Sequence, residues 1–223
     1  MTDTATFLLS LSVLFPFLTG LIRWRIICQR YYPLFILFCL ALLVELVTRY
    51  ALTSKNLSWV PGNNLYVLVE SILIPLQFVV WGYTLKKLKA FYAITGILVL
   101  GWVTEHLLLG DITRLHPYFR MFYSLLTVLL SINTINYLVI QEERNLVRHP
   151  IFIICTGFII FFTYQLVYEG IYNIVSDLES IDTSKLNTAF SIINAVCNIL
   201  YGIAFLLVPA RNSIDWLAEK NNR

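Results

Sequence analysis

The sequence is poor in charged residues: Asp, Glu, Lys and Arg make up 13% of its 223 positions, about half the share in ordinary soluble domains. It also lacks a long polar stretch, because its apolar runs are separated by short connections. No part of the chain could therefore fold as a separate soluble catalytic or DNA-binding domain. The net charge of +3 is spread along the chain and gives no reason to expect a nucleic-acid partner.

The motifs of common active sites are also missing. There is no GxSxG serine motif, no phosphate loop, no dinucleotide fingerprint and no HExxH zinc motif. Four cysteines are present without a CxxC pair, and we expect them to be free packing residues: Cys28, Cys39, Cys155 and Cys197. We therefore predict no disulfide, no metal site and no cofactor.

What the sequence has instead is apolar residues, which form 58% of the chain. A membrane core of about 30 Å needs roughly 20 apolar residues for each helical crossing. Residues 1–208 divide into seven such segments, which predicts an all-α, polytopic bundle with a short tail at 209–223. The seven segments are about 5–22, 32–52, 63–85, 90–109, 117–140, 150–174 and 186–208.

Proline positions agree with this division, since proline is tolerated mainly in the first turn of a helix. Pro33, Pro117 and Pro150 open segments, whereas Pro16 and Pro75 fall within segments and predict kinks. The first seven residues, MTDTATF, contain no basic residue. We therefore expect a first membrane helix and not a cleaved signal peptide.

Lys and Arg are distributed unevenly over alternate loops. Eleven of the sixteen fall in the first, third and fifth loops and the tail, three fall in the other loops, and Arg49 and Arg120 lie inside segments. Short cytoplasmic loops retain positive charge. We therefore expect an outside N-terminus, a cytoplasmic C-terminus and a multi-pass position in a cell inner membrane.

Six charged side chains inside segments share one depth, about 5 to 10 Å below the predicted outer boundary. They are Glu45, Arg49, Glu70, Glu105, Arg120 and Glu169. Buried ionisable groups in membranes usually face the bundle interior or a wet cavity. Glu45 and Arg49 are four residues apart, the favourable spacing for an ion pair on one helix face. The layer predicts a polar vestibule that opens outward.

Uncharged polar residues also recur at helical spacing. They include Tyr66, one helical turn before Glu70 in the third segment, Asn194 in the seventh and a Ser/Thr stripe in the fifth. Such stripes also join membrane helices by hydrogen bonds, without binding any ligand. We expect the ligand-binding set to be Glu45, Arg49, Tyr66, Glu70, Glu105, Arg120, Glu169 and Asn194.

The strings ELVTR, at residues 45–49, and NNLYVLVES, at 63–71, lie in this layer. With seven segments in the orientation given above, the chain resembles small seven-helix bacterial membrane proteins and the membrane regions of seven-helix sensor kinases. The resemblance implies a sensory role. The chain departs from a sensor kinase because it contains no kinase domain.

Together these features favour a membrane sensor or binding protein that takes a small polar or cationic ligand, or protons, and signals to a cytoplasmic or membrane partner. One alternative is a small proton- or cation-coupled transporter that uses the same acids. Another is a membrane-embedded enzyme acting on lipid, with Glu70, Glu105, His106 and His116 around a metal. The spacing of those four residues matches no metal motif.

Overall fold

The fold is given by a computed structural model of the chain. It describes the backbone of residues 9–53, 58, 60–82, 88–108, 110–113, 117–141, 146–175 and 183–209. Within these ranges the side chains of 51–53, 172–175 and 183–185 are not described. The predicted tail, apart from its first residue, lies outside the described residues.

The described ranges are helical, with short turns and no strand. The elements in chain order are η1 (Leu11–Val13), α2 (Leu14–Ile22), α3 (Trp24–Ile27), α4 (Tyr32–Thr53), α5 (Val60–Trp81), α6 (Leu88–Val103), η2 (Thr104–Leu108), α7 (Pro117–Gln141), η3 (Leu146–Arg148), α8 (Pro150–Val175) and α9 (Thr183–Leu207). The predicted all-α class is confirmed. The helix that opens at Leu88 continues through η2, which is a single π-helical turn.

Among the described residues, six helices are long and apolar enough to cross a membrane. They are Tyr32–Tyr50, Val60–Trp81, Leu88–Leu108, Pro117–Gln141, Pro150–Ile171 and Leu186–Leu207. Each corresponds to a segment predicted from the sequence, with ends within a few residues. Their 19 to 25 residues give lengths of about 28 to 38 Å, which match a hydrocarbon core.

The first predicted segment, 5–22, is different. Its described apolar part is a shorter helix, Leu11–Ile22, whose length is about 18 Å. It packs against α9 and α4. The side chain of Arg23 then donates from Nη1 to the carbonyl oxygens of Phe205, at 2.9 Å, and Leu206. These carbonyls end α9 and have no partner within the helix, so Arg23 satisfies them with positive charge.

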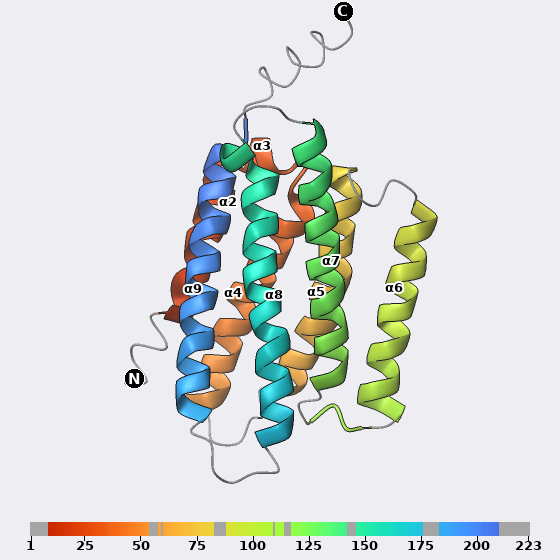
Figure 1. Cartoon of the computed structure of the whole chain (residues 1–223). Helices are drawn as coiled ribbons and strands as arrows, with labels where there is room; N and C mark the ends of the chain where they lie inside the picture. Colours follow the sequence, from red (N-terminus) through yellow and green to blue (C-terminus); the bar gives the residue numbers. More distant parts are fainter. Residues whose placement is uncertain are drawn as a thin grey trace, which may run out of the picture.

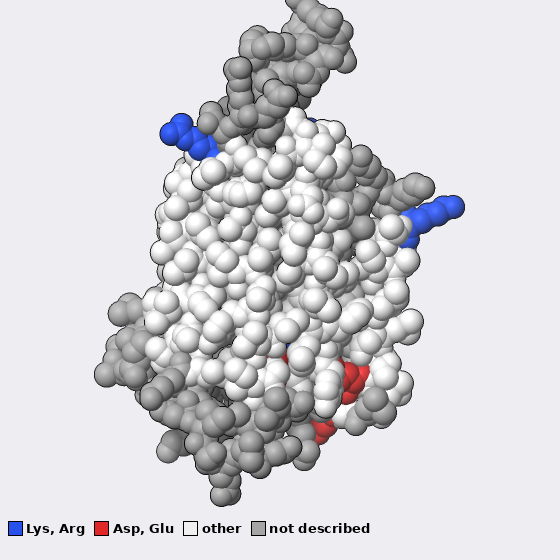
Figure 2. Space-filling view, in the orientation of Figure 1, with Lys and Arg blue, Asp and Glu red and all other residues white. Residues whose placement is uncertain are grey.

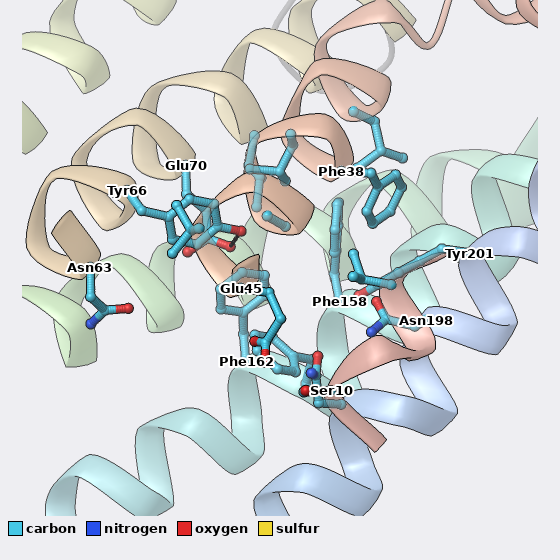
Figure 3. Close-up of a pocket in the computed structure, with 18 of the residues that line it drawn as sticks. Ser10, Phe38, Glu45, Asn63, Tyr66, Glu70, Phe158, Phe162, Asn198 and Tyr201 are labelled. Carbon is cyan, nitrogen blue, oxygen red and sulfur yellow. Dashed lines mark hydrogen bonds between the residues drawn. The ribbon is translucent and has the colours of Figure 1, made fainter. Parts of the chain in front are cut away.

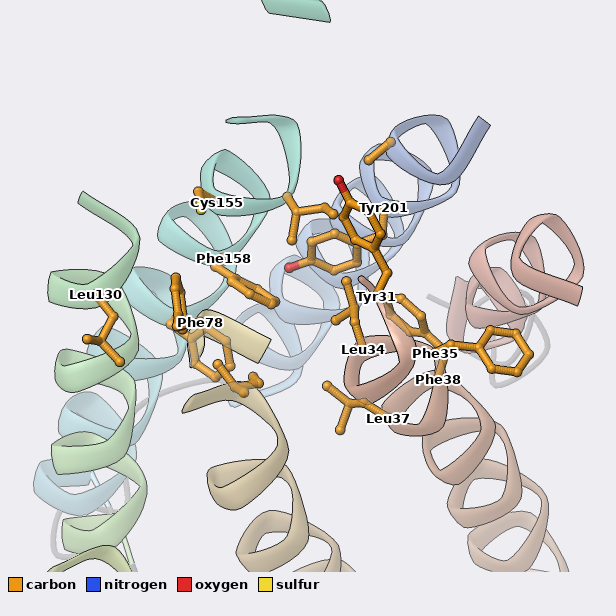
Figure 4. Close-up of a cluster of buried hydrophobic side chains, with 14 of the residues drawn as sticks. Tyr31, Leu34, Phe35, Leu37, Phe38, Phe78, Leu130, Cys155, Phe158 and Tyr201 are labelled. Atoms are coloured by element: carbon orange, nitrogen blue, oxygen red, sulfur yellow. The ribbon is translucent and has the colours of Figure 1, made fainter. Parts of the chain in front are cut away.

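The helices form a bundle in which α7, α8 and α9 lie side by side, with α4 and α5 behind them (Figure 1). Helix α6 stands at the edge, where it contacts α5 and α7. Aromatic side chains fill the middle of the bundle (Figure 4), among them Phe78 and Phe158, whose ring centroids are 6.2 Å apart. Most of the apolar surface of α6 remains available to lipid.

A buried glutamine holds the start of α4. Gln77, on α5, accepts a hydrogen bond from the backbone N–H of Leu34 at 3.1 Å and donates one to the carbonyl of Arg30 at 2.7 Å. The N–H groups of a first helical turn lack partners within the helix. Gln77 therefore supplies a partner for one of them and fixes α4 against α5.

Charged residues are segregated along the bundle axis. Figure 2 shows Lys and Arg at the end where α3 lies and Asp and Glu toward the opposite end. In the described part of the chain, Arg23, Arg25, Arg30, Lys89 and Arg148 lie at or beside the helix ends near α3. The layer of acids predicted from the sequence thus lies in the other half of the bundle.

Candidate functional site

A cavity of about 240 Å³ lies within the bundle and extends from the level of the acids Glu45 and Glu70 to Leu34, in the first turn of α4. Its described lining comes from the start of the first helix and from α4, α5, α7, α8 and α9. Figure 3 shows Glu45, Tyr66 and Glu70 on one part of its wall and Phe158, Asn198 and Tyr201 on another. Helix α6 contributes no side chain to the described lining.

Five of the eight residues predicted for ligand binding line this cavity: Glu45, Tyr66, Glu70, Arg120 and Asn194. The other three, Arg49, Glu105 and Glu169, do not belong to the described lining. All three were placed with the five by depth, and Arg49 also by its four-residue spacing from Glu45. Neither signal determines the direction in which a side chain points.

Glu70 is the most buried carboxylate of the lining, with 8% of its surface exposed. Its Oε1 accepts a hydrogen bond of 3.4 Å from the hydroxyl of Tyr66, one turn earlier on α5. Its Oε2 accepts none from the residues that the structure describes. Arg120 supplies the opposite charge that acts on Glu70. A buried carboxylate with a free oxygen beside a cavity can accept a hydrogen bond or a charge from a solute.

Arg120 connects the cavity to α8. Its Nη1 forms an ion pair with Oε1 of Glu169 at 3.2 Å, and the two side chains are 14% and 8% exposed. Its Nη2 is buried and has no hydrogen-bond partner among the described residues. Since one guanidinium faces two carboxylates, Glu70 and Glu169, the acids of this region outnumber its nearby cation.

Glu45 is half-buried on α4 and lines the cavity. Arg49, one turn further on, is exposed and lies outside the described lining. Of the two residues predicted to share one helix face, only Glu45 therefore lies at the cavity. Its carboxylate adds a second negative charge to the wall that already contains Glu70.

Glu105 lies in the π-helical turn η2 and faces the start of α7. Its two oxygens accept hydrogen bonds from the backbone N–H groups of Tyr118, at 3.0 Å, and Phe119. A carboxylate at a helix N-terminus satisfies unpaired N–H groups and interacts favourably with the helix dipole. In the structure Glu105 thus has a capping role, and it connects α6 to the helix that bears Arg120.

Aromatic rings form much of the remaining wall. Seven of the twenty described lining residues are aromatic, whereas Phe, Trp and Tyr together form 15% of the whole chain. The Tyr201 ring lies with its centroid 5.5 Å from those of both Phe38 and Phe158. A Cβ on Gly157 would meet the Tyr201 ring at 2.5 Å. The glycine therefore leaves the space in which this ring lies.

Sequence reasoning did not select these rings as a site. Phe158, Phe161 and Phe162 recur at three- and four-residue spacing, which puts them on one face of α8. This shared face was the feature of the sequence that could have indicated a site, but aromatic stripes in membrane segments are usually packing residues. Only the structure shows that Phe158 and Phe162 pack with their neighbours and also line a cavity.

The polar stripe on α9 divides between packing and lining. The Asn198 side chain donates a hydrogen bond of 2.9 Å to the Ser12 hydroxyl, and Asn187 accepts one of 2.7 Å from Tyr168. These contacts join α9 to the first helix and to α8, as expected for polar groups between membrane helices. Asn194 and Asn198 also line the cavity.

The Ser/Thr stripe on α7 continues from Arg120 at helical spacing, but its role is different from that of Arg120. Thr127, Ser131 and Thr134 are buried, and each hydroxyl donates to the carbonyl oxygen four residues earlier. These hydroxyls find their hydrogen-bond partners within their own helix. Because Ser and Thr side chains are small, they also let neighbouring helices approach closely. Helix α7 packs extensively against α8.

Metal-ligating groups are scattered over the part of the chain that the structure describes. Within it, no three His, Cys, Asp or Glu residues lie together in a way that could hold a metal ion. His106 is buried and stacks on Trp102, with ring centroids 4.9 Å apart. His116 lies outside the described residues, and the four cysteines are free thiols.

No family model, curated protein or solved structure matches this chain. Its class therefore follows from the fold alone. In its described ranges the chain is a helical bundle with six apolar helices of membrane-spanning length, which is compatible with a multi-pass membrane protein.

Proposed function

We propose that the chain is an inner-membrane sensor or binding protein that takes a small polar or cationic solute, or protons, into the cavity lined by Glu45 and Glu70. In this proposal it crosses the membrane seven times, with the N-terminus outside and the C-terminus in the cytoplasm. The cavity then faces outward. The basic loops at the α3 end face the cytoplasm, where they would contact a signalling partner.

One observation supports this proposal above the others: charged side chains from separate helices, one buried and two partly buried, border one cavity. Glu45, Glu70 and Arg120 come from α4, α5 and α7. Holding ionisable groups in a membrane bundle costs free energy, about 2.5 to 3.5 kcal/mol each at the bilayer centre on insertion scales. Groups retained at this cost around an open space favour a role in binding over a role in packing.

Binding also fits better than transport. Packed rings lie at the α3 end of the bundle, among them Tyr31 against Trp81, with centroids 6.0 Å apart, and Tyr31 against Phe205, at 6.2 Å. A transporter would need these contacts to open. A sensor needs only a small shift of the helices that line the cavity.

The test compares the wild type with a variant whose cavity is filled. Ala41 lines the cavity and is half-buried, so Ala41→Trp would occupy part of its volume. Purified protein in nanodiscs is screened by thermal shift against small cations, zwitterions and neutral polar solutes, and across pH. Solutes that stabilise the wild type but not Ala41→Trp support the proposal. If the panel contains no such solute, the proposal is contradicted. If a stabilising solute also enters proteoliposomes that contain the protein, the function is transport and not sensing.

A further inference from the structure

The lining of the cavity combines charged side chains with aromatic rings. Its described charged side chains are Glu45, Glu70 and Arg120. The guanidinium of Arg120 is already paired with Glu169, which lies outside the lining. The wall of the cavity is therefore left with excess negative charge, which favours a positively charged solute.

The aromatic part of the wall favours some cations over others. The rings of Phe38, Phe158 and Tyr201 come from α4, α8 and α9 and meet at the cavity (Figure 3). The faces of such rings attract cations that have been stripped of water, and cages of this kind bind quaternary ammonium groups. A small inorganic ion needs a shell of oxygen ligands, which these rings do not offer.

Size leads to the same class of ligand. A cavity of about 240 Å³ has room for about eight water molecules at roughly 30 Å³ each. It lies just below the usual range of pockets for drug-sized ligands, which begins at about 300 Å³. A compact organic cation fills this space with its alkyl groups, whereas a bare metal ion does not.

Resting on the function proposed above, we infer that the ligand is a small organic cation, an ammonium group with alkyl substituents. Its charge lies toward Glu70 and Glu45, and its alkyl groups lie against the rings of Phe38, Phe158 and Tyr201. Glu70 contributes the oxygen that has no hydrogen-bond partner among the described residues. Arg120 remains paired with Glu169, so its guanidinium is not available to a small anion.

The experiment uses a pair of probes that differ in charge and hardly in shape: choline and its neutral carbon isostere, 3,3-dimethyl-1-butanol. Binding to the full-length protein in nanodiscs is measured by calorimetry. We expect choline to bind at least about tenfold more tightly than the isostere, the effect of about 1.4 kcal/mol of charge recognition. Sodium chloride at equal ionic strength serves as the inorganic control.

Two kinds of variant separate the roles of charge and ring. Glu70→Gln and Glu45→Gln keep the shape of the side chain and remove its charge, and each should weaken choline binding about tenfold. Phe158→Leu removes a ring from the lining and should also weaken it. The matched control is Phe122→Leu, because Phe122 is 49% exposed on α7 and outside the lining. This control should leave the affinity unchanged.

The outcomes distinguish this inference from the proposal on which it rests. Equal binding of choline and the isostere, lost in Ala41→Trp, would overturn the organic-cation class and leave a binding cavity. Unchanged affinity in both Gln variants would overturn it as well. If choline and every solute in the thermal-shift panel fail to bind the wild type, both proposals are wrong.

Discussion

Arg120 on α7 and Glu169 on α8 form an ion pair, with 3.2 Å between Nη1 and Oε1 and little of either side chain exposed. The pair joins two helices that pack extensively, at the level of the cavity. Arg120 is the member that reaches the lining. Any change to Glu169 should therefore affect the cavity through Arg120.

The first prediction concerns this pair. Glu169→Gln should lower the free energy of unfolding by up to about 3 to 5 kcal/mol, because it removes the paired carboxylate from a largely buried guanidinium and leaves only the more distant charge of Glu70. Arg120→Gln should cost a similar amount. The double variant should cost less than the sum of the two, since neither charge then remains unpaired. Unfolding in mixed detergent micelles measures all three, and strict additivity would show that the two groups do not interact.

Much of the fold could be predicted because the membrane imposes a simple rule. An apolar run of about 20 residues must become a helix, since lipid cannot satisfy backbone N–H and C=O groups. Proline refined the boundaries: Pro117 and Pro150 are the first residues of α7 and α8. The third segment was predicted to begin at 63, yet Pro61 is the second residue of α5. That first-turn position is one where proline lacks only an N–H that the helix does not use.

The site was harder to predict, since sequence position gives depth in the membrane but not the rotation of each helix. Glu45 and Glu105 were assigned to the same layer, yet one lines the cavity and the other caps α7. The cap depends on the π-helical turn η2, for which the sequence carries no clear signal. The rings around Tyr201 depend on contacts between distant segments, such as Gly157 with Tyr201.

The second prediction concerns the cap of α7. Glu105→Ala removes the acceptor for two backbone N–H groups and should destabilise the protein by about 1 to 2 kcal/mol. Glu105→Gln keeps one oxygen and loses the charge, so it should cost less. Hydrogen exchange at the amides of Tyr118 and Phe119 provides a local measurement. Unchanged exchange at both amides in Glu105→Ala would show that the carboxylate does not cap this helix.

The third prediction concerns the number of crossings. The described helix Leu11–Ile22 is too short to span the membrane by itself, although it packs against α4 and α9. Seven crossings place the two ends of the chain on opposite faces of the membrane, whereas six place them on the same face. Impermeant labelling of a single tag at either end of the chain, in intact cells, measures this. We expect the N-terminal tag to be labelled outside and the C-terminal tag to be protected.

The fourth prediction concerns the ring beside the cavity. Gly157→Ala puts a methyl group where the Tyr201 ring now lies, 2.5 Å from the nearest ring atom. The ring is buried and packed against Phe38 and Phe158, so it must move at the cost of these contacts. We expect destabilisation of about 1 to 3 kcal/mol, as for other overpacked cores, and weaker binding of any solute that uses the cavity.

Gly96→Ala is the matched control for that variant. Gly96 also lies within a long helix, α6, but a Cβ there meets no atom within 4 Å. The added methyl group should be neutral or stabilise α6 slightly, because alanine has the higher helix propensity. Thermal unfolding and solute binding are measured for both variants. If Gly157→Ala behaves like Gly96→Ala in both measurements, Tyr201 has room to move and its position does not shape the cavity.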